Sequence, residues 1–113
     1  MKVELDGKLV ETTETGFLVN QEDWNERIAE VIAEQEGIQL TQRHWDVINY
    51  LRDEYFNNAG NNPNMRSMIK DMGNIWAGEK VESKTLYDLF PGNPSKQAGR
   101  IGGLPESKRK GGY

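Results

Sequence analysis

The sequence predicts a mainly α-helical fold: a small bundle of about five helices, two of them a helix-turn-helix-like pair, with an N-terminal β-hairpin and a flexible C-terminal arm. Apolar residues recur every three or four positions over most of the chain, and breaks rich in glycine, proline and asparagine divide this pattern into five segments. At 113 residues, the chain has the length of one domain. We predict that domain over residues 1–103, with the hairpin in 1–19, the helical body in 20–103 and an arm over 104–113.

The first residues are expected to form a β-hairpin. Asp6-Gly7 lies between short apolar segments, and such a pair is typical of a tight turn whose two central residues need positive φ. A further extended segment is predicted at Gly16–Val19. Two or three short strands are marginal on their own in water, so we expect them to lie on the helical body.

The first helix is predicted from Asn20 to Glu36, with Gly37 as its C-terminal stop. Its apolar residues follow the spacing of one helix face: Trp24, Ile28, Val31 and Ile32. The second helix is predicted from Thr41, whose hydroxyl can cap the first turn, to about Asn57.

Three further helices are predicted after a turn over residues 58–63. The third spans about 64–77, and its apolar stripe, which we expect to face the core, consists of Met65, Met68, Ile69, Met72, Ile75 and Trp76. Ser83 is expected to cap a fourth helix. Asn93-Pro94 begins a fifth, short helix that runs from Ser95 to about Ile101 and ends at Gly102-Gly103.

Charge is divided unevenly along the chain. Residues 1–91 contain 9 Lys/Arg and 17 Asp/Glu, a net charge of −8, whereas residues 92–113 contain 5 and 1, a net charge of +4. The basic end also contains 6 of the 12 glycines. This composition suits a segment that reaches an anionic surface of a partner; the alternative is a solvated terminus without a role.

The absence of cysteine excludes several kinds of site. Without Cys, the chain can form no disulfide, zinc–thiolate or iron–sulfur site and has no thiol nucleophile. There is also no apolar run of the length of a signal peptide or membrane span. We therefore predict a soluble, cytoplasmic protein without a membrane partner.

Other enzymatic groupings are also missing from the sequence. The single histidine, His44, has no neighbouring nucleophile or metal-ligand spacing. The glycines of 99–103 lack the strand and the long helix of a dinucleotide-binding turn. We expect no metal, no cofactor and no enzyme activity.

The pair of helices over 41–57 and 64–77 allows one alternative, a helix-turn-helix that binds DNA. Its DNA contacts would be Asn64, Arg66, Lys70 and Asn74. Residues 41–91 contain 6 basic and 7 acidic groups, which is a poor balance for neutralising phosphates. An ordinary antiparallel helix pair is the favoured interpretation.

Five segments of the sequence resemble one known family. They are residues 3–8 (VELDGK), 40–55 (LTQRHWDVINYLRDEY), 86–91 (LYDLFP), 94–100 (PSKQAGR) and 103–105 (GLP). In this order they resemble the DsrC/TusE/DsvC family of sulfur-relay proteins, also called the gamma subunit of dissimilatory sulfite reductase. The resemblance spans nearly the whole chain.

The resemblance implies a cytoplasmic helical protein whose C-terminal arm carries sulfur on cysteine and enters a partner enzyme. TusE-type members pass persulfide sulfur toward tRNA thiolation, and DsrC-type members serve sulfite reduction or its reverse. Here the place of the inner cysteine is Gly99, and that of the terminal cysteine falls within Lys110-Gly111-Gly112. Neither position holds a sulfur that could form a persulfide.

We therefore expect a non-catalytic binding or regulatory partner of a sulfite reductase-type or sulfurtransferase-type complex. The candidate partner-binding residues are Lys96, Arg100, Gly103, Leu104 and Pro105. Lys96 and Arg100 are four residues apart, so they share one face of the short helix, where they could meet an anionic cleft or merely be solvated. The alternative function is a helix-turn-helix regulator of sulfur-metabolism genes.

Overall fold

The computed structural model describes residues 2–5 and 8–105. The elements of its N-terminal part are β1 (Lys2–Leu5), β2 (Lys8–Glu11), the short 3-10 helix η1 (Gln21–Asp23) and α1 (Glu26–Gln35). The following helices are α2 (Gln42–Asn57), α3 (Met65–Ile75), α4 (Ser83–Leu89) and α5 (Pro94–Ile101). The predicted mainly α-helical fold with an N-terminal hairpin is confirmed.

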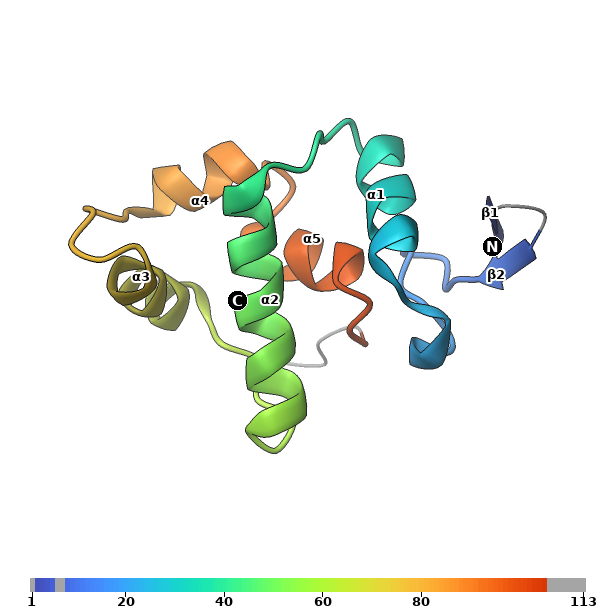
Figure 1. Ribbon diagram of the computed structural model, residues 1–113, viewed down its shortest axis with the longest axis horizontal. Helices are drawn as coiled ribbons and strands as arrows, with labels where there is room; N and C mark the ends of the chain where they lie inside the picture. Colours follow the sequence, from blue (N-terminus) through green and yellow to red (C-terminus); the bar gives the residue numbers. More distant parts are fainter. Residues whose placement is uncertain (1, 6–7, 106–113) are drawn as a thin grey trace.

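The two strands form an antiparallel hairpin at one end of the molecule, beside α1 (Figure 1). In its register Val3 pairs with Val10 and Leu5 with Lys8, and the predicted turn residues between the strands lie outside the described part. Beyond β2, Thr12 forms an isolated bridge with Leu18. The segment predicted to be extended therefore lies against the base of the hairpin, where Leu18 is buried in the core.

α1 begins at Glu26, so the prediction of a helix from Asn20 is wrong at its start. The oxygen of the Asn20 side chain accepts a backbone N–H and begins η1, and the side chain of Asn25 does the same for α1. Between these two caps, Trp24 is extended, with φ −73° and ψ 138°. The spacing of Trp24 to Ile28 is thus not helical, and Trp24 is available to pack elsewhere.

α5 is the central helix of the body. It contacts α1, α2 and α4, and Figure 1 shows it between α1 and α2. The core around it contains fully buried residues from every long helix: Ile28, Ile32, Val47, Ile48, Met68, Met72, Leu86, Phe90, Ala98 and Ile101. The sequence predicts this helix from its ends, whereas its place in the core follows only from the structure.

α3 contributes to the core through its methionines. Met68 and Met72 are fully buried, as predicted for the stripe, whereas Ile75 on the same predicted stripe is 51% exposed. Trp76 is partly buried against the core, and its Nε1 donates a hydrogen bond to Asp46 Oδ2 of α2 at 2.8 Å. The buried stripe is therefore narrower than the sequence predicts, since Ile75 stays exposed although α3 contacts α4 and, through Trp76, also α2.

α2 and α3 are joined by residues 58–64, and each makes its main helix contact elsewhere, α2 with α5 and α3 with α4. This arrangement gives no support to a helix-turn-helix unit, in which the two helices pack on each other across a turn of three or four residues. Within the described part of the chain, every helix is too short or too polar to cross a bilayer.

Candidate functional site

The residues that the resemblance selects lie on α5 and on the turn that follows it. Asn93 is the N-cap residue of α5, and its side-chain oxygen accepts the backbone N–H of Lys96 at 3.3 Å. Pro94 occupies the first helical position, where its missing N–H leaves no hydrogen bond unmade. These local signals place Gly99 in the last turn of the helix.

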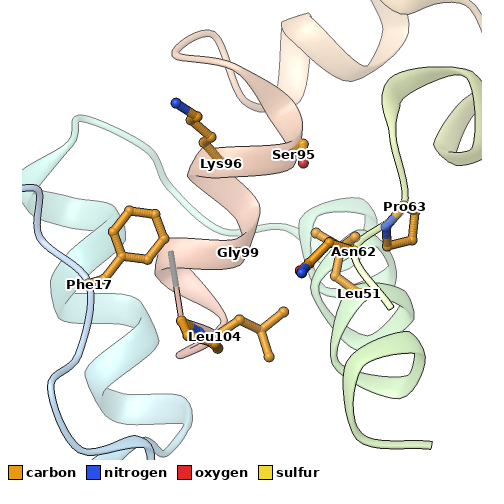
Figure 2. A pocket seen from close by; sticks show the side chains of 9 residues that line it. Phe17, Leu51, Asn62, Pro63, Ser95, Lys96, Gly99 and Leu104 are labelled. Atoms are coloured by element: carbon orange, nitrogen blue, oxygen red, sulfur yellow. The ribbon is translucent and has the colours of Figure 1, made fainter. Parts of the chain in front are cut away.

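Gly99 lies at a narrow cleft beside α5. A volume of about 20 Å³ is accessible there, roughly enough for one water-sized group. The lining residues come from five parts of the chain: Phe17, Leu51, Asn62, Pro63, Ser95, Lys96, Gly99, Leu104 and Pro105. Figure 2 shows Gly99 on α5 with Phe17 on one side and Leu51 and Pro63 on the other.

Gly99 itself is buried, yet the space above its Cα is unfilled. A Cβ added at this position would meet no heavy atom within 4 Å, apart from its own helix and chain neighbours. The other walls of the cleft are mostly apolar, and Lys96 is the one charged residue among those that line it. The fold therefore leaves an opening at the position where the resemblance implies a cysteine side chain.

The two basic residues of α5 have different surroundings. Lys96 is half-buried and lines the cleft. Arg100 turns toward α1, where its Nη1 donates to Glu36 Oε1 at 2.7 Å, and its guanidinium carbon lies 5.2 Å from the centre of the Phe17 ring. The Arg100 side chain is only 23% exposed, so its charge is paired with Glu36 inside the fold.

Glu36 and Gln97 complete this polar group. Gln97 Nε2 donates to the same Glu36 oxygen at 2.7 Å, and Gln97 Oε1 accepts the backbone N–H of Gly92 at 2.8 Å. Because Glu36 follows α1 and Gly92 precedes α5, this group fixes α5 relative to both neighbouring segments.

The residues predicted to begin the arm are part of the body. Leu104, the first residue of the predicted arm, is only 4% exposed and belongs to the core. Gly103, the last residue of the predicted domain, is buried with φ +75°. Pro105 is half-buried and lines the cleft together with Leu104. The predicted terminal site at Lys110, Gly111 and Gly112 lies outside the described residues.

Several residues of this region are absent from the sequence-based prediction. Phe17, Leu51 and Pro63 line the cleft, and Trp24 and Arg52 contact the end of α5. Trp24 is predicted as a face residue of the first helix, which conceals its role. No local signal identifies the others, because they come from separate segments that only the fold brings together.

His44 lies in the core, away from the residues that line the cleft. Its Nε2 donates to the carbonyl of Leu89 at 2.9 Å, and its Nδ1 accepts the backbone N–H of Thr41 at 3.0 Å. Burial lowers the pKa of His44, an effect that the hydrogen bond to Leu89 opposes only in part. In the described part of the chain, no three His, Asp or Glu side chains group closely enough to hold a metal ion.

The chain is similar to a curated sulfurtransferase. It is 45% identical over 103 residues to "Sulfurtransferase TusE" of Escherichia coli (strain K12), and the match covers 89% of this chain and 92% of the relative. It is also 41% identical over 104 residues to the TusE of Yersinia pseudotuberculosis, with 92% and 95% covered.

A solved structure shows the same fold. The NMR structure of DsrC from Allochromatium vinosum is 42% identical to this chain, with a TM-score of 0.86 and 96% of both chains covered. These similarities extend over nearly all of the described elements, so they concern the arrangement of the whole body and not a single motif.

The prediction that this chain has no enzyme activity is wrong. Relatives at 41% and 45% identity are named sulfurtransferases, which is the name of a class of enzymes. The prediction rested on the lack of a local nucleophile or metal site. The transfer of a group between two proteins depends on docking surfaces that many segments form together. Similarity over the whole length of the chain therefore identifies such a protein, and a local motif does not.

These relatives give no support to the DNA-binding alternative, since they are named for sulfur transfer and for DsrC.

The family model described as "DsrC like protein" matches residues 4–109. This match spans every helix of the structure and the cleft at Gly99. The chain therefore belongs to the DsrC-like family of sulfur-relay proteins.

Proposed function

We propose that this protein is a cytoplasmic docking and regulatory member of a sulfur relay. It binds a sulfurtransferase-type or sulfite reductase-type protein through the cleft at Gly99 and through the residues after α5. The sequence contains no cysteine, so in this proposal the relayed sulfur stays on a cysteine of the partner while the two proteins are in contact.

The opening above Gly99 is the observation that carries the proposal. A buried helix position with no neighbour around its missing Cβ costs dispersion contacts, and a well-packed core normally fills such space. The cleft opens beside Leu104 and Pro105, the residues with which the C-terminal segment begins. A side chain of a partner that binds this segment can therefore enter the cleft.

The charge around the cleft favours an anionic partner surface. Lys96 is the charged residue among the lining residues, and the sequence after Pro105 contains three basic residues, Lys108, Arg109 and Lys110, and one acidic residue, Glu106. Complementary charge of this kind raises the association rate and is screened by salt. Binding that weakens as salt is added is thus an expected property of the complex.

Binding to purified partners tests the proposal. Sulfurtransferase-type and sulfite reductase-type complexes from the same organism are titrated with this protein by calorimetry at low salt. We expect binding by the natural chain and at least about tenfold weaker binding by Gly99→Leu, since a leucine side chain is larger than the water-sized space of the cleft and blocks it to a partner group. Gly99→Ala, which adds only the Cβ, gives a smaller effect of the same sign.

Lys80→Ala is the matched control. Lys80 is exposed, with 87% of its side chain accessible, and forms only an exposed ion pair with Glu82, so its loss leaves binding unchanged. Thermal melts establish that each variant is folded at the assay temperature. The docking function is wrong if the natural chain binds neither class of partner at low salt. The role of the cleft alone is wrong if Gly99→Leu binds as tightly as the natural chain.

A further inference from the structure

The end of α5 is unusual in how its last carbonyl groups are satisfied. The last four carbonyls at a helix C-terminus have no partner within the helix. In α5, the backbone N–H of Leu104 bonds Gly99 O at 2.9 Å, and the N–H of Gly103 bonds Arg100 O at 3.2 Å. This pair of bonds around a left-handed glycine is the Schellman motif, and it accounts for two carbonyls.

Two side chains from distant segments bind the next two carbonyls. Trp24 Nε1 donates to Ile101 O at 2.9 Å, and Arg52 Nη1 donates to Gly102 O at 2.5 Å. The two side chains also contact each other, because the Arg52 guanidinium carbon lies 3.7 Å from the centre of the Trp24 ring. We call Trp24 and Arg52 the exit clamp.

The exit clamp fits closely around the turn. A Cβ on Gly103 would lie 2.3 Å from Cδ1 of Trp24, and a Cβ on Gly102 would lie 3.7 Å from Cγ of Arg52. Phe56 also contacts this guanidinium, with its ring centre 4.9 Å from the Arg52 guanidinium carbon. Burial lowers the pKa of Arg52 from its ordinary value, which fits a guanidinium shielded by these rings.

The end of α1 shows that such a clamp is not needed to end a helix. There Gly37 and Ile38 form the same pair of backbone bonds, to Glu34 O at 3.0 Å and to Ala33 O at 2.8 Å. A Cβ on Gly37 would meet nothing within 4 Å. The side chains around Gly102 and Gly103 are therefore not required to end α5, and they have a further role.

We propose that Trp24 and Arg52 are positioning residues that fix the path of Gly102 to Pro105, from which the chain continues, for the binding of a partner. Two consecutive glycines have more conformational freedom than any other pair. By holding Gly102 and Gly103 in one conformation, the clamp reduces the ordering entropy that binding of the following segment must overcome. This inference rests on the proposed docking function.

The experiment compares Trp24→Phe with the natural chain in binding the partner. Phenylalanine keeps a ring beside Gly103 and Arg52 but cannot donate to Ile101 O. We expect about tenfold weaker binding, because without this hydrogen bond the turn is less ordered in the free protein and binding must order it. Arg52→Lys, which keeps the charge and a donor but not the planar stack, is expected to lie between the natural chain and Trp24→Phe.

Trp76→Phe is the matched control. Trp76 also donates through Nε1, to Asp46, and also lies under an arginine, with the Arg43 guanidinium carbon 4.5 Å from its ring centre. This pair joins α2 to the C-cap of α3 and is not part of the exit clamp, so its loss is expected to change partner binding less than about twofold. All measurements are made at a temperature at which every variant is folded.

A double-mutant cycle separates positioning from general stability. Replacing Lys108, Arg109 and Lys110 by alanine removes charge from the residues that follow the clamped turn in the sequence. If the clamp acts through that segment, Trp24→Phe has little further effect in this background, because the two changes affect one interaction. Equal binding by Trp24→Phe and the natural chain, or additive losses in the cycle, would overturn the positioning role. Absence of binding by the natural chain would instead overturn the docking function.

Discussion

His44 shows how a single residue can take a structural role that its chemistry does not suggest. Its ring bridges the start of α2, through the Thr41 N–H, and the end of α4, through the Leu89 carbonyl. It also meets Phe90 edge to face, with ring centres 5.1 Å apart. Because a carbonyl only accepts, Nε2 carries the proton, and Nδ1 must stay unprotonated to accept from Thr41.

This arrangement predicts a pH-dependent stability. The pKa of His44 is lowered in the folded protein, mainly by burial, so as the pH falls the unfolded chain binds this proton first. The stabilisation is complete above the ordinary histidine pKa of about 6.5 and decreases as the pH falls below it. Urea unfolding at about pH 7.5 and about pH 5.5, both above the carboxyl range, should show lower stability at the acid value.

His44→Gln is the control for that measurement. Glutamine at the third helical position can accept the N-cap N–H in a capping box but does not titrate. We expect the variant to lose less stability than the natural chain between the two pH values. An identical pH dependence in both proteins would show that other groups cause it.

At the scale of the elements, the sequence predicts the C-terminal ends of helices better than their N-terminal starts. The C-terminal stops predicted at Gly37 and at Gly102-Gly103 agree with the ends of α1 and α5, because a residue with positive φ ends a helix locally. The predicted start of the first helix is wrong because two residues act as N-caps: Asn20 caps η1 and Asn25 caps α1. Sequence spacing does not tell which of two good caps begins the longer helix.

Gly103 and Gly37 form a matched pair for a stability test. Both have positive φ, +75° and +77°, in the same motif, so alanine costs about 1–2 kcal/mol at either position. Only at Gly103 would the new Cβ also overlap Trp24, which adds roughly 1–3 kcal/mol. Chemical unfolding should therefore show a larger loss for Gly103→Ala than for Gly37→Ala. Equal losses of stability in the two variants would mean that the Trp24 side chain can move away from the new Cβ without a cost in free energy.

At the scale of the whole molecule, the basic end of the chain is joined to the acidic body by Glu36. The sequence divides into a body with net charge −8 and an end with +4, and Arg100 and Gln97 of that end both donate to Glu36. The side chains of Glu36 and Arg100 are 19% and 23% exposed. Partial burial makes this pair stronger than an exposed one.

Glu36→Ala is predicted to destabilise the fold by about 1–3 kcal/mol, because it leaves the donors of Arg100 and Gln97 without their acceptor. Arg27→Ala is the control. It breaks the pair with Glu30, whose atoms are 3.9 Å apart and whose side chains are 64% and 57% exposed, and it should cost less than about 0.5 kcal/mol. Chemical unfolding of the natural chain and of the two variants measures both losses of stability. Similar losses in the two variants would contradict a special role for Glu36.

The candidate site was predictable only where it is continuous in sequence. Lys96, Gly99, Leu104 and Pro105 belong to one segment, and all four line the cleft. The inward turn of Arg100 was not predictable, because its acceptor Glu36 lies at the end of a different helix. The helix period places Arg100 and Lys96 on one face, but the neighbouring helix decides what that face meets.

The sequence by itself determined the class of fold, the number and order of the helices, and the absence of any cysteine that could carry sulfur. These follow from local forces: apolar period, caps and composition. Only the tertiary structure decided that α5 lies at the centre of the body, that Gly99 borders an open cleft and that Trp24 and Arg52 hold the turn after it. Each of these depends on contacts between residues far apart in the chain, whose packing no local pattern encodes.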